Sequence, residues 1–143
     1  MRLWSNDFAE GQPIPDQCAY GNENVSPHLA WDDVPDGTLS FALTCNDPDA
    51  PRKDWIHWLV HGIPSEVREI ASGAPVPGTE VENDFGKPGW GGPAPPSGTH
   101  RYFFTLYALS VPTLEGAKKK NFKKLCEKYM IDSAQTMGVY SKK

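Results

Sequence analysis

Five side chains that could do chemistry lie in two segments of the sequence. Asp47, Asp49 and His57 belong to the first segment, and His100 and Tyr102 belong to the second. An imidazole donates or accepts hydrogen bonds near neutral pH, and a neighbouring carboxylate can orient it and favour its protonated form. Two imidazoles, a phenol and the backbone N–H groups of a loop form a suitable seat for an anion. These residue types predict an anion-binding pocket; the alternative is that they are polar strand ends whose hydrogen bonds the loops satisfy.

Other chemistries are poorly supported by the sequence. His57 and His61 are spaced for a metal site on a helix, but the residues between them are typical of a strand, where they would lie ~13 Å apart. No Gly-x-Ser-x-Gly elbow, P-loop or dinucleotide fingerprint occurs. Cys45 alternates with Phe41 and Leu43, which indicates a core thiol rather than a nucleophile. We therefore expect neither a metal nor a cofactor.

The elements that position the candidate residues are predicted to be strands. Residues 39–47 and 55–63 suit a half-buried sheet, and the segment between them is a proline-containing loop. In an antiparallel pair, the end of the first strand and the start of the second lie at the same end of the sheet. Residues 101–109 form a strand that is apolar on both faces, which places it in the middle of a sandwich or under a helix. The Gly/Pro-rich loop before it is expected to be ordered, with Trp90 as its anchor.

The C-terminal segment has apolar residues spaced three and four apart. This spacing predicts an amphipathic helix over residues 122–137 that ends at Gly138, with a break at Asp132-Ser133. The other face of this helix carries lysines, which indicates a solvated face or, alternatively, a face that attracts an acidic surface.

Composition sets further bounds. A chain of 143 residues predicts a single domain, 1–143, and 13 glycines with 14 prolines favour short strands and turns. The net charge of −4 argues against a nucleic-acid partner. No apolar segment is long enough to cross a bilayer, and the N-terminal residues lack the apolar core of a signal peptide, so we expect a cytoplasmic protein. The three cysteines lack metal-ligand spacing and are expected to be buried, reduced thiols.

Long motifs in the sequence resemble the phosphatidylethanolamine-binding protein family. The segment Asp47-Pro48-Asp49-Ala50-Pro51, followed by Trp55-Ile56-His57-Trp58, is similar to the first signature block of this family. The segment from Gly92-Pro93 to His100-Arg101-Tyr102 is similar to the second block. Residues 24–31 and 34–38, and the ending Gly138-Val139-Tyr140, resemble the prokaryotic-type, Raf kinase inhibitor-like branch. The resemblance covers nearly the whole chain.

The resemblance implies a mainly β fold, an antiparallel Greek-key β-sandwich. The C-terminal amphipathic helix is predicted separately, from the spacing of apolar residues. It also implies a small cavity for phosphate-like anions, including the head group of phosphatidylethanolamine. Carried onto this sequence, the pocket comprises Asp47, Asp49, Pro51, Trp55, His57, Gly92, Pro93, His100 and Tyr102. A cis peptide is typical of the first block, and Ala50–Pro51 is the candidate bond. The segment between Pro96 and His100 is short and the C-terminal segment is lysine-rich, so the kinase binding of the animal members is not transferred.

Three hypotheses of function remain. The first is a binding module for a small anionic or phosphorylated ligand that regulates or inhibits a partner, such as a protein kinase or a protease, in signalling. The second is a hydrolase that acts on a small ester with the same His/Asp pocket, although the sequence offers no obvious nucleophile. The third is an inhibitor that uses its surface, in which case His100→Ala would leave inhibition unchanged. A homodimer is a further expectation, because prokaryotic-type relatives often pair.

Overall fold

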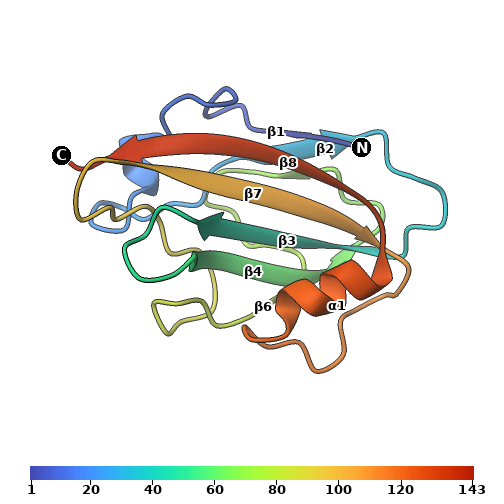
Figure 1. Ribbon diagram of the computed structural model, residues 1–143. Coiled ribbons are helices and arrows are strands. Elements are labelled where there is room, and N and C mark those ends of the chain that lie inside the picture. Colours follow the sequence, from blue (N-terminus) through green and yellow to red (C-terminus); the bar gives the residue numbers. More distant parts are fainter.

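The computed structural model, which describes residues 1–143, contains two antiparallel sheets packed face to face and one short helix (Figure 1). The small sheet has the order β1-β2-β5, made of Arg2–Trp4, Leu29–Asp32 and Glu69–Ile70. The large sheet has the order β6-β4-β3-β7-β8, made of Thr79–Glu80, Trp55–Pro64, Ser40–Asp47, Thr99–Leu109 and Met130–Ser141. A 3-10 turn, Asp16–Cys18, and the helix α1, Phe122–Tyr129, complete the chain.

The large sheet has Greek-key connectivity. Strands β3, β4 and β6 lie side by side in chain order, and β7 then returns to the free side of β3. This arrangement confirms the predicted β-sandwich. It also confirms the predicted strands 39–47, 55–63 and 101–109, each to within two residues of its observed ends.

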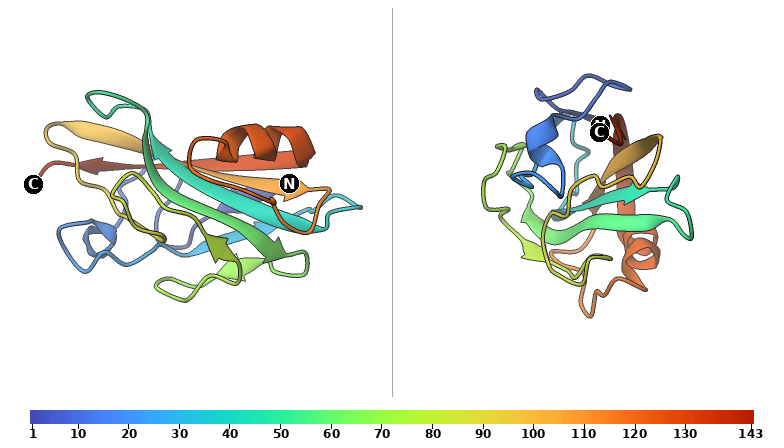
Figure 2. Two further views of the ribbon diagram at one scale, coloured as in Figure 1. Left: turned by 90° about the horizontal axis from the view of Figure 1, so that it is seen from below. Right: turned by 90° about the vertical axis from the view of Figure 1, so that its left-hand side faces the viewer.

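The large sheet is covered on both faces, which explains why its central strands are so apolar. Its inner face packs on the small sheet through a core that includes Trp31, Phe41, Trp58 and Phe104. Its outer face packs under α1 through a smaller cluster of apolar residues: Ala42, Leu59, Tyr107, Leu109, Leu114, Phe122 and Cys126. Figure 2 shows α1 and the small sheet on opposite faces of the large one.

The predicted C-terminal helix is wrong beyond residue 129. Only Phe122–Tyr129 is helical, and Met130–Ser141 forms strand β8, paired with β7 almost along its whole length. The helix-like spacing of Met130, Ala134 and Met137, beyond Tyr129, is a coincidence, because these residues belong to a strand. From there on, Thr136, Gly138 and Tyr140 are buried at every second position, as in a strand. Tertiary pairing with the long β7 strand thus outweighs local helix propensity.

Gly138 does not end a helix; it lies within β8 where another segment approaches closely. A Cβ added at this position would come within 2.6 Å of Ile14 Cγ1 and 2.9 Å of the Phe8 ring. Both of those side chains are buried, so they have little room to move. The N-terminal residues therefore lie against β8 because position 138 has no side chain.

Two other expectations can be compared directly with the structure. The three cysteines are buried and free, as predicted. No helix in the structure has the length and apolar character needed to cross a membrane.

We predict that Gly138→Ala lowers the free energy of unfolding by about 1–3 kcal/mol, the usual effect of overpacking a filled core. The measurement is urea denaturation followed by circular dichroism. Gly21→Ala is the control, because a Cβ at Gly21 meets nothing within 4 Å. A Gly138→Ala variant as stable as the control would contradict this packing.

Candidate functional site

Asp47 and His100 form a buried pair at one end of the large sheet. Asp47 is the last residue of β3, and His100 lies at the start of the neighbouring strand β7. The Asp47 Oδ2 atom lies 2.7 Å from His100 Nδ1, and both side chains are almost fully buried. Asp47 Oδ1 accepts a second hydrogen bond from the backbone N–H of Asp49 at 2.8 Å. The carboxylate thus holds the Nδ1 proton of His100, and Nε2 of that ring makes no hydrogen bond to protein.

His57 reaches the same region from β4 through an irregularity in the strand. Cys45 pairs with Trp58 and Asn46 pairs with Ile56, so His57 is an extra residue with no partner on β3. Such a bulge bends the strand and redirects a side chain. The redirected ring of His57 lies edge-on to the ring of Tyr102, with centroids 5.1 Å apart.

The tautomer of His57 follows from the hydrogen bond that its imidazole makes to Gly91. His57 Nδ1 lies 2.5 Å from the carbonyl oxygen of Gly91, so Nδ1 carries the proton and donates it. Burial lowers the pKa of His57, and the Gly91 carbonyl only partly opposes this effect. At neutral pH the ring is therefore neutral, and its Nε2 lone pair can accept a hydrogen bond.

The third buried group is Tyr102. Its side chain is fully buried, and its hydroxyl makes no hydrogen bond of good geometry within the protein, although the backbone N–H of Ala94 lies near enough to oppose slightly the rise of its pKa. Burial raises the pKa of Tyr102, so the phenol keeps its proton at all physiological pH values. A buried hydroxyl without a partner is unfavourable and rare in proteins, which makes this atom a candidate ligand contact.

The Gly/Pro-rich loop shapes the site. The sequence predicts that loop N–H groups help to bind an anion, but the N–H groups of Gly91 and Gly92 already have partners within the protein. Gly91 N–H donates to the His57 carbonyl at 3.0 Å, and Gly92 N–H donates to Asn24 Oδ1 at 2.8 Å. Pro93 has no N–H, and its carbonyl accepts from Tyr20. Only glycine fits at position 92, because a Cβ there would overlap the backbone carbonyl of Cys18.

Trp90 anchors this loop, as predicted. Its ring packs against Trp58 and Phe104 in the core, with centroids 5.3 Å and 5.9 Å away. Its indole N–H donates to the carbonyl of Cys18 at 3.0 Å. The loop that carries Gly91 and Gly92 is thereby fixed to both the sheet and the N-terminal segment.

The remaining predicted residues lie at the edge of this group. Asp49 makes no hydrogen bond to either histidine; it binds the Arg101 side chain through two hydrogen bonds of 2.9 Å, which lower the pKa of Asp49 to about 2. Trp55 is half-buried, and Pro51 is exposed on the β3–β4 loop. The Ala50–Pro51 bond is not cis, because the structure contains no cis peptide. The trans loop is held instead by the contacts of Asp47 and Asp49.

Sequence reasoning missed an aromatic wall beside His57. Phe85 lies edge-on to His57 and to Trp55, each with centroids 5.5 Å away, and stacks on Tyr20 at 4.1 Å. Asn24, which holds Gly92, was also missed. Nothing in the local sequence around Phe85, Tyr20 and Asn24 indicates a site. These three residues lie in irregular segments that only the fold brings together.

His61 does not join His57. Its Nδ1 atom contacts Thr113 Oγ1 at 2.9 Å, and its ring lies beside Phe122 of α1 on the outer face of the sheet. His57 contacts Tyr102 on the inner face. Strand spacing alone places the two histidines on one face, about 13 Å apart. The structure places them on opposite faces, because the bulge at His57 reverses the alternation between them.

Comparison with solved structures supports the fold. The E. coli protein YbcL, described as a new member of the mammalian PEBP family, matches with a TM-score of 0.93 and 31% identity over 99% of this chain and 98% of that one. A phosphatidylethanolamine-binding protein homologue from Chlamydia trachomatis matches with a TM-score of 0.92 and 35% identity over 99% and 97% of the two chains.

Sequence comparison identifies the same group of proteins. A UPF0098 protein of Aquifex aeolicus is 41% identical over 99% of this chain and 89% of its own length. The UPF0098 protein YbhB of E. coli is 43% identical over 80% of this chain and 82% of its own. The family model for phosphatidylethanolamine-binding proteins matches residues 4–141. The chain therefore belongs to the phosphatidylethanolamine-binding protein family.

Proposed function

We propose that Asp47, His57, His100 and Tyr102 form a binding site for a phosphate group or a similar small anion. The observation that carries this proposal is the set of polar atoms without protein partners: Nε2 of both histidines and the hydroxyl of Tyr102. The other polar atom of each imidazole is held by protein, so these rings are oriented before a ligand binds. Preorganised groups of this kind reduce the entropic cost of binding.

The chemistry of the atoms indicates the protonation state of the ligand. His100, paired with Asp47, can carry a second proton on Nε2 and donate it to an anionic oxygen, and Tyr102 is a second donor. Neutral His57 offers an acceptor, so the ligand must present a donor nearby. A singly protonated phosphate monoester has both kinds of atom, because its second pKa is about 6.

We infer that the protein acts as a binding module whose ligand-bound state regulates or inhibits a partner, such as a kinase or a protease. The family name specifies phosphatidylethanolamine, whose head group contains a phosphate. The Asp47–His100 pair would also suit a general base in a hydrolase for small esters. However, burial raises the pKa of the Cys45 thiol well above its usual value, which disfavours Cys45 as the nucleophile. Binding is therefore the better supported function.

We predict that phosphate and phosphorylethanolamine bind the native protein more tightly at pH 6 than at pH 8, because the lower pH protonates the phosphate group, which then offers a donor to the Nε2 atom of His57. The His57→Ala, His100→Ala double variant should bind at least about tenfold more weakly, the expected loss of hydrogen bonds to a charged ligand. Isothermal titration calorimetry measures both effects.

The matched control is His61→Ala, which removes a buried histidine from the same strand but outside the site. It should bind like the native protein. If the double variant bound phosphate as tightly as the native protein, or if the native protein did not bind it, the proposed site would be contradicted.

We predict that His57 titrates below pH 6.5, because burial lowers the pKa of its folded form. At a pH between the pKa of His57 in the folded protein and its pKa in the unfolded chain, the unfolded chain binds more protons. The free energy of unfolding that neutral His57 contributes is therefore fully present above pH 6.5. It is lost as the pH falls through the folded-state pKa. NMR of the imidazole Cε1–H gives the midpoint directly.

Urea unfolding at pH 5.5 and pH 7.5 provides the second readout. The His57→Gln variant should lose less stability on acidification than the native protein. An NMR midpoint at or above 6.5, or an unchanged dependence on pH in the variant, would contradict the assigned environment.

A further inference from the structure

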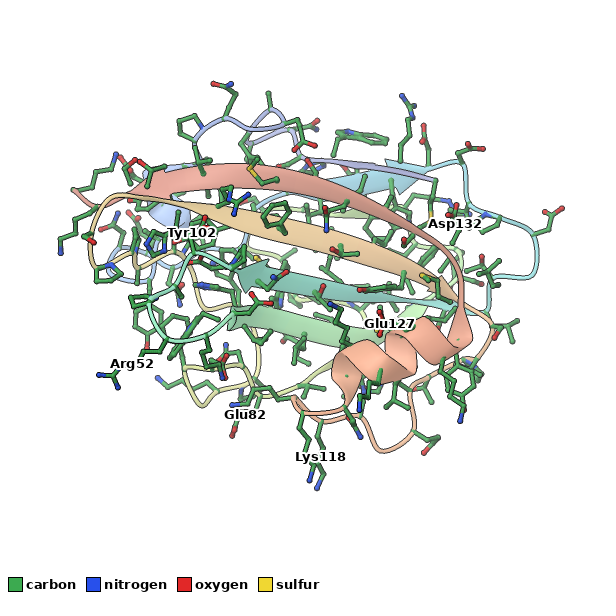
Figure 3. All side chains as sticks on the ribbon, viewed as in Figure 1. Arg52, Glu82, Tyr102, Lys118, Glu127 and Asp132 are labelled. Carbon is green, nitrogen blue, oxygen red and sulfur yellow. The ribbon has the colours of Figure 1, made fainter.

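A hollow lies beside α1, on the face of the large sheet opposite to the candidate phosphate site. Its volume is about 360 Å³, which falls within the range of small-molecule sites, roughly 300–1,000 Å³. Strands β3, β4, β7 and β8 supply the floor and α1 supplies one wall. Figure 3 shows Glu127 between α1 and the strands, whereas Lys118 points away from the sheet.

Strand alternation separates this hollow from the proposed phosphate site. Asn46 and Phe103 line the hollow, whereas Asp47 and Tyr102, their neighbours in the chain, belong to the phosphate site. Successive side chains of a strand point to opposite faces. The two sites therefore lie on opposite faces of the same two strands, and a ligand in one does not contact the other.

The floor of the hollow combines apolar surface with hydroxyl groups. Phe103 and Ile56 are only half-buried and present apolar surface. Thr105 Oγ1 accepts a hydrogen bond from Gln135 at 2.9 Å. The hydroxyl of Tyr107 makes no hydrogen bond to protein. The floor could thus hold a flat apolar group and contact a polar atom at its edge.

The α1 side of the hollow is rich in positive charge. The segment from Lys118 to Lys128 contains six lysines and one glutamate, although the whole protein has a net charge of −4. Lys53 and Lys119 both bind the same oxygen of the buried Asp84, each at 2.9 Å, so two ammonium groups share one carboxylate. Lys123, in the first turn of α1, also lines the hollow four residues after Lys119 and forms no ion pair.

Two carboxylates also line the hollow, and their positions limit where an anion can bind. Asp54 accepts a hydrogen bond from Asn46 Nδ2 at 2.7 Å. Glu127 lies one turn beyond Lys123. Burial, and to a smaller extent the nearby Cys126 and Glu127, raises the pKa of Tyr107 to about 12. The end of the hollow between Lys119 and Lys123 is therefore the more favourable end for an anion.

We propose that this hollow binds a small organic anion with a flat, apolar body. The anionic group lies at Lys123 near Lys119, the body rests on Phe103 and Ile56, and the Tyr107 hydroxyl contacts a polar edge. The site is independent of the phosphate site and would hold its ligand even if that site bound nothing.

The probe is 8-anilinonaphthalene-1-sulfonate, an aromatic sulfonate whose fluorescence rises on binding. We expect the native protein to bind one dye molecule with an affinity that falls as salt is added. Lys123→Gln should weaken binding roughly three- to fivefold, the scale of one exposed charge. Thr105→Trp should abolish binding by filling the floor, whereas Thr105→Val should retain it.

Two controls separate the hollow from the rest of the surface. Lys124→Gln removes the adjacent exposed lysine, which does not line the hollow, and His100→Ala alters the phosphate site; both should bind the dye like the native protein. Circular dichroism checks that Thr105→Trp is folded, and NMR shifts of the backbone amides of Thr44, Phe103 and Thr105 locate the dye. Absence of binding by the native protein, unchanged binding by Lys123→Gln or Thr105→Trp, or loss of binding by His100→Ala would overturn the proposal.

Discussion

The buried carboxylate of Asp47 is the constraint on which the candidate site depends. A carboxylate removed from water is stable only if its oxygens find hydrogen-bond donors. One oxygen binds His100 and the other binds the backbone of Asp49, so the end of β3, the start of β7 and the β3–β4 loop are fixed to one another. His57 enters the same space only because a bulge interrupts β4. The arrangement of the site thus depends on the hydrogen-bonded carboxylate of Asp47 and on the bulge in β4.

The second constraint is the close approach of backbone to backbone. Gly92 lies against the carbonyl of Cys18, and Gly138 lies against Ile14 and Phe8. At both positions the N-terminal segment, far away in the sequence, closes against the large sheet because no side chain intervenes. The N–H group of Gly91 donates to the carbonyl of His57, and the N–H group of Gly92 donates to the side chain of Asn24. These two residues therefore contribute shape and orientation to the site, and not donors for a ligand.

Much of this arrangement could be predicted from the sequence, and the failures have physical reasons. The apolar runs around Leu43 and Phe104 predicted the central strands, and the strand ends predicted that Asp47, His57 and His100 lie at one end of the sheet. The C-terminal prediction failed because apolar spacing cannot tell where a helix gives way to a strand that a long partner, β7, stabilises. Phe85 and Asn24 were missed because irregular segments have no periodicity from which their positions could be inferred. The cis bond expected at Ala50–Pro51 came from the resemblance alone, and the loop is trans.

The measurement that tests the central claim most directly is ¹⁵N NMR of histidine-labelled protein during titration with phosphate. Nε2 is the unpartnered atom of both His57 and His100. The account predicts that these two Nε2 resonances shift together and saturate, while His28 and His61 stay unchanged. Saturating shifts confined to His28 or His61, or no shift of His57 and His100 at millimolar phosphate, would contradict it.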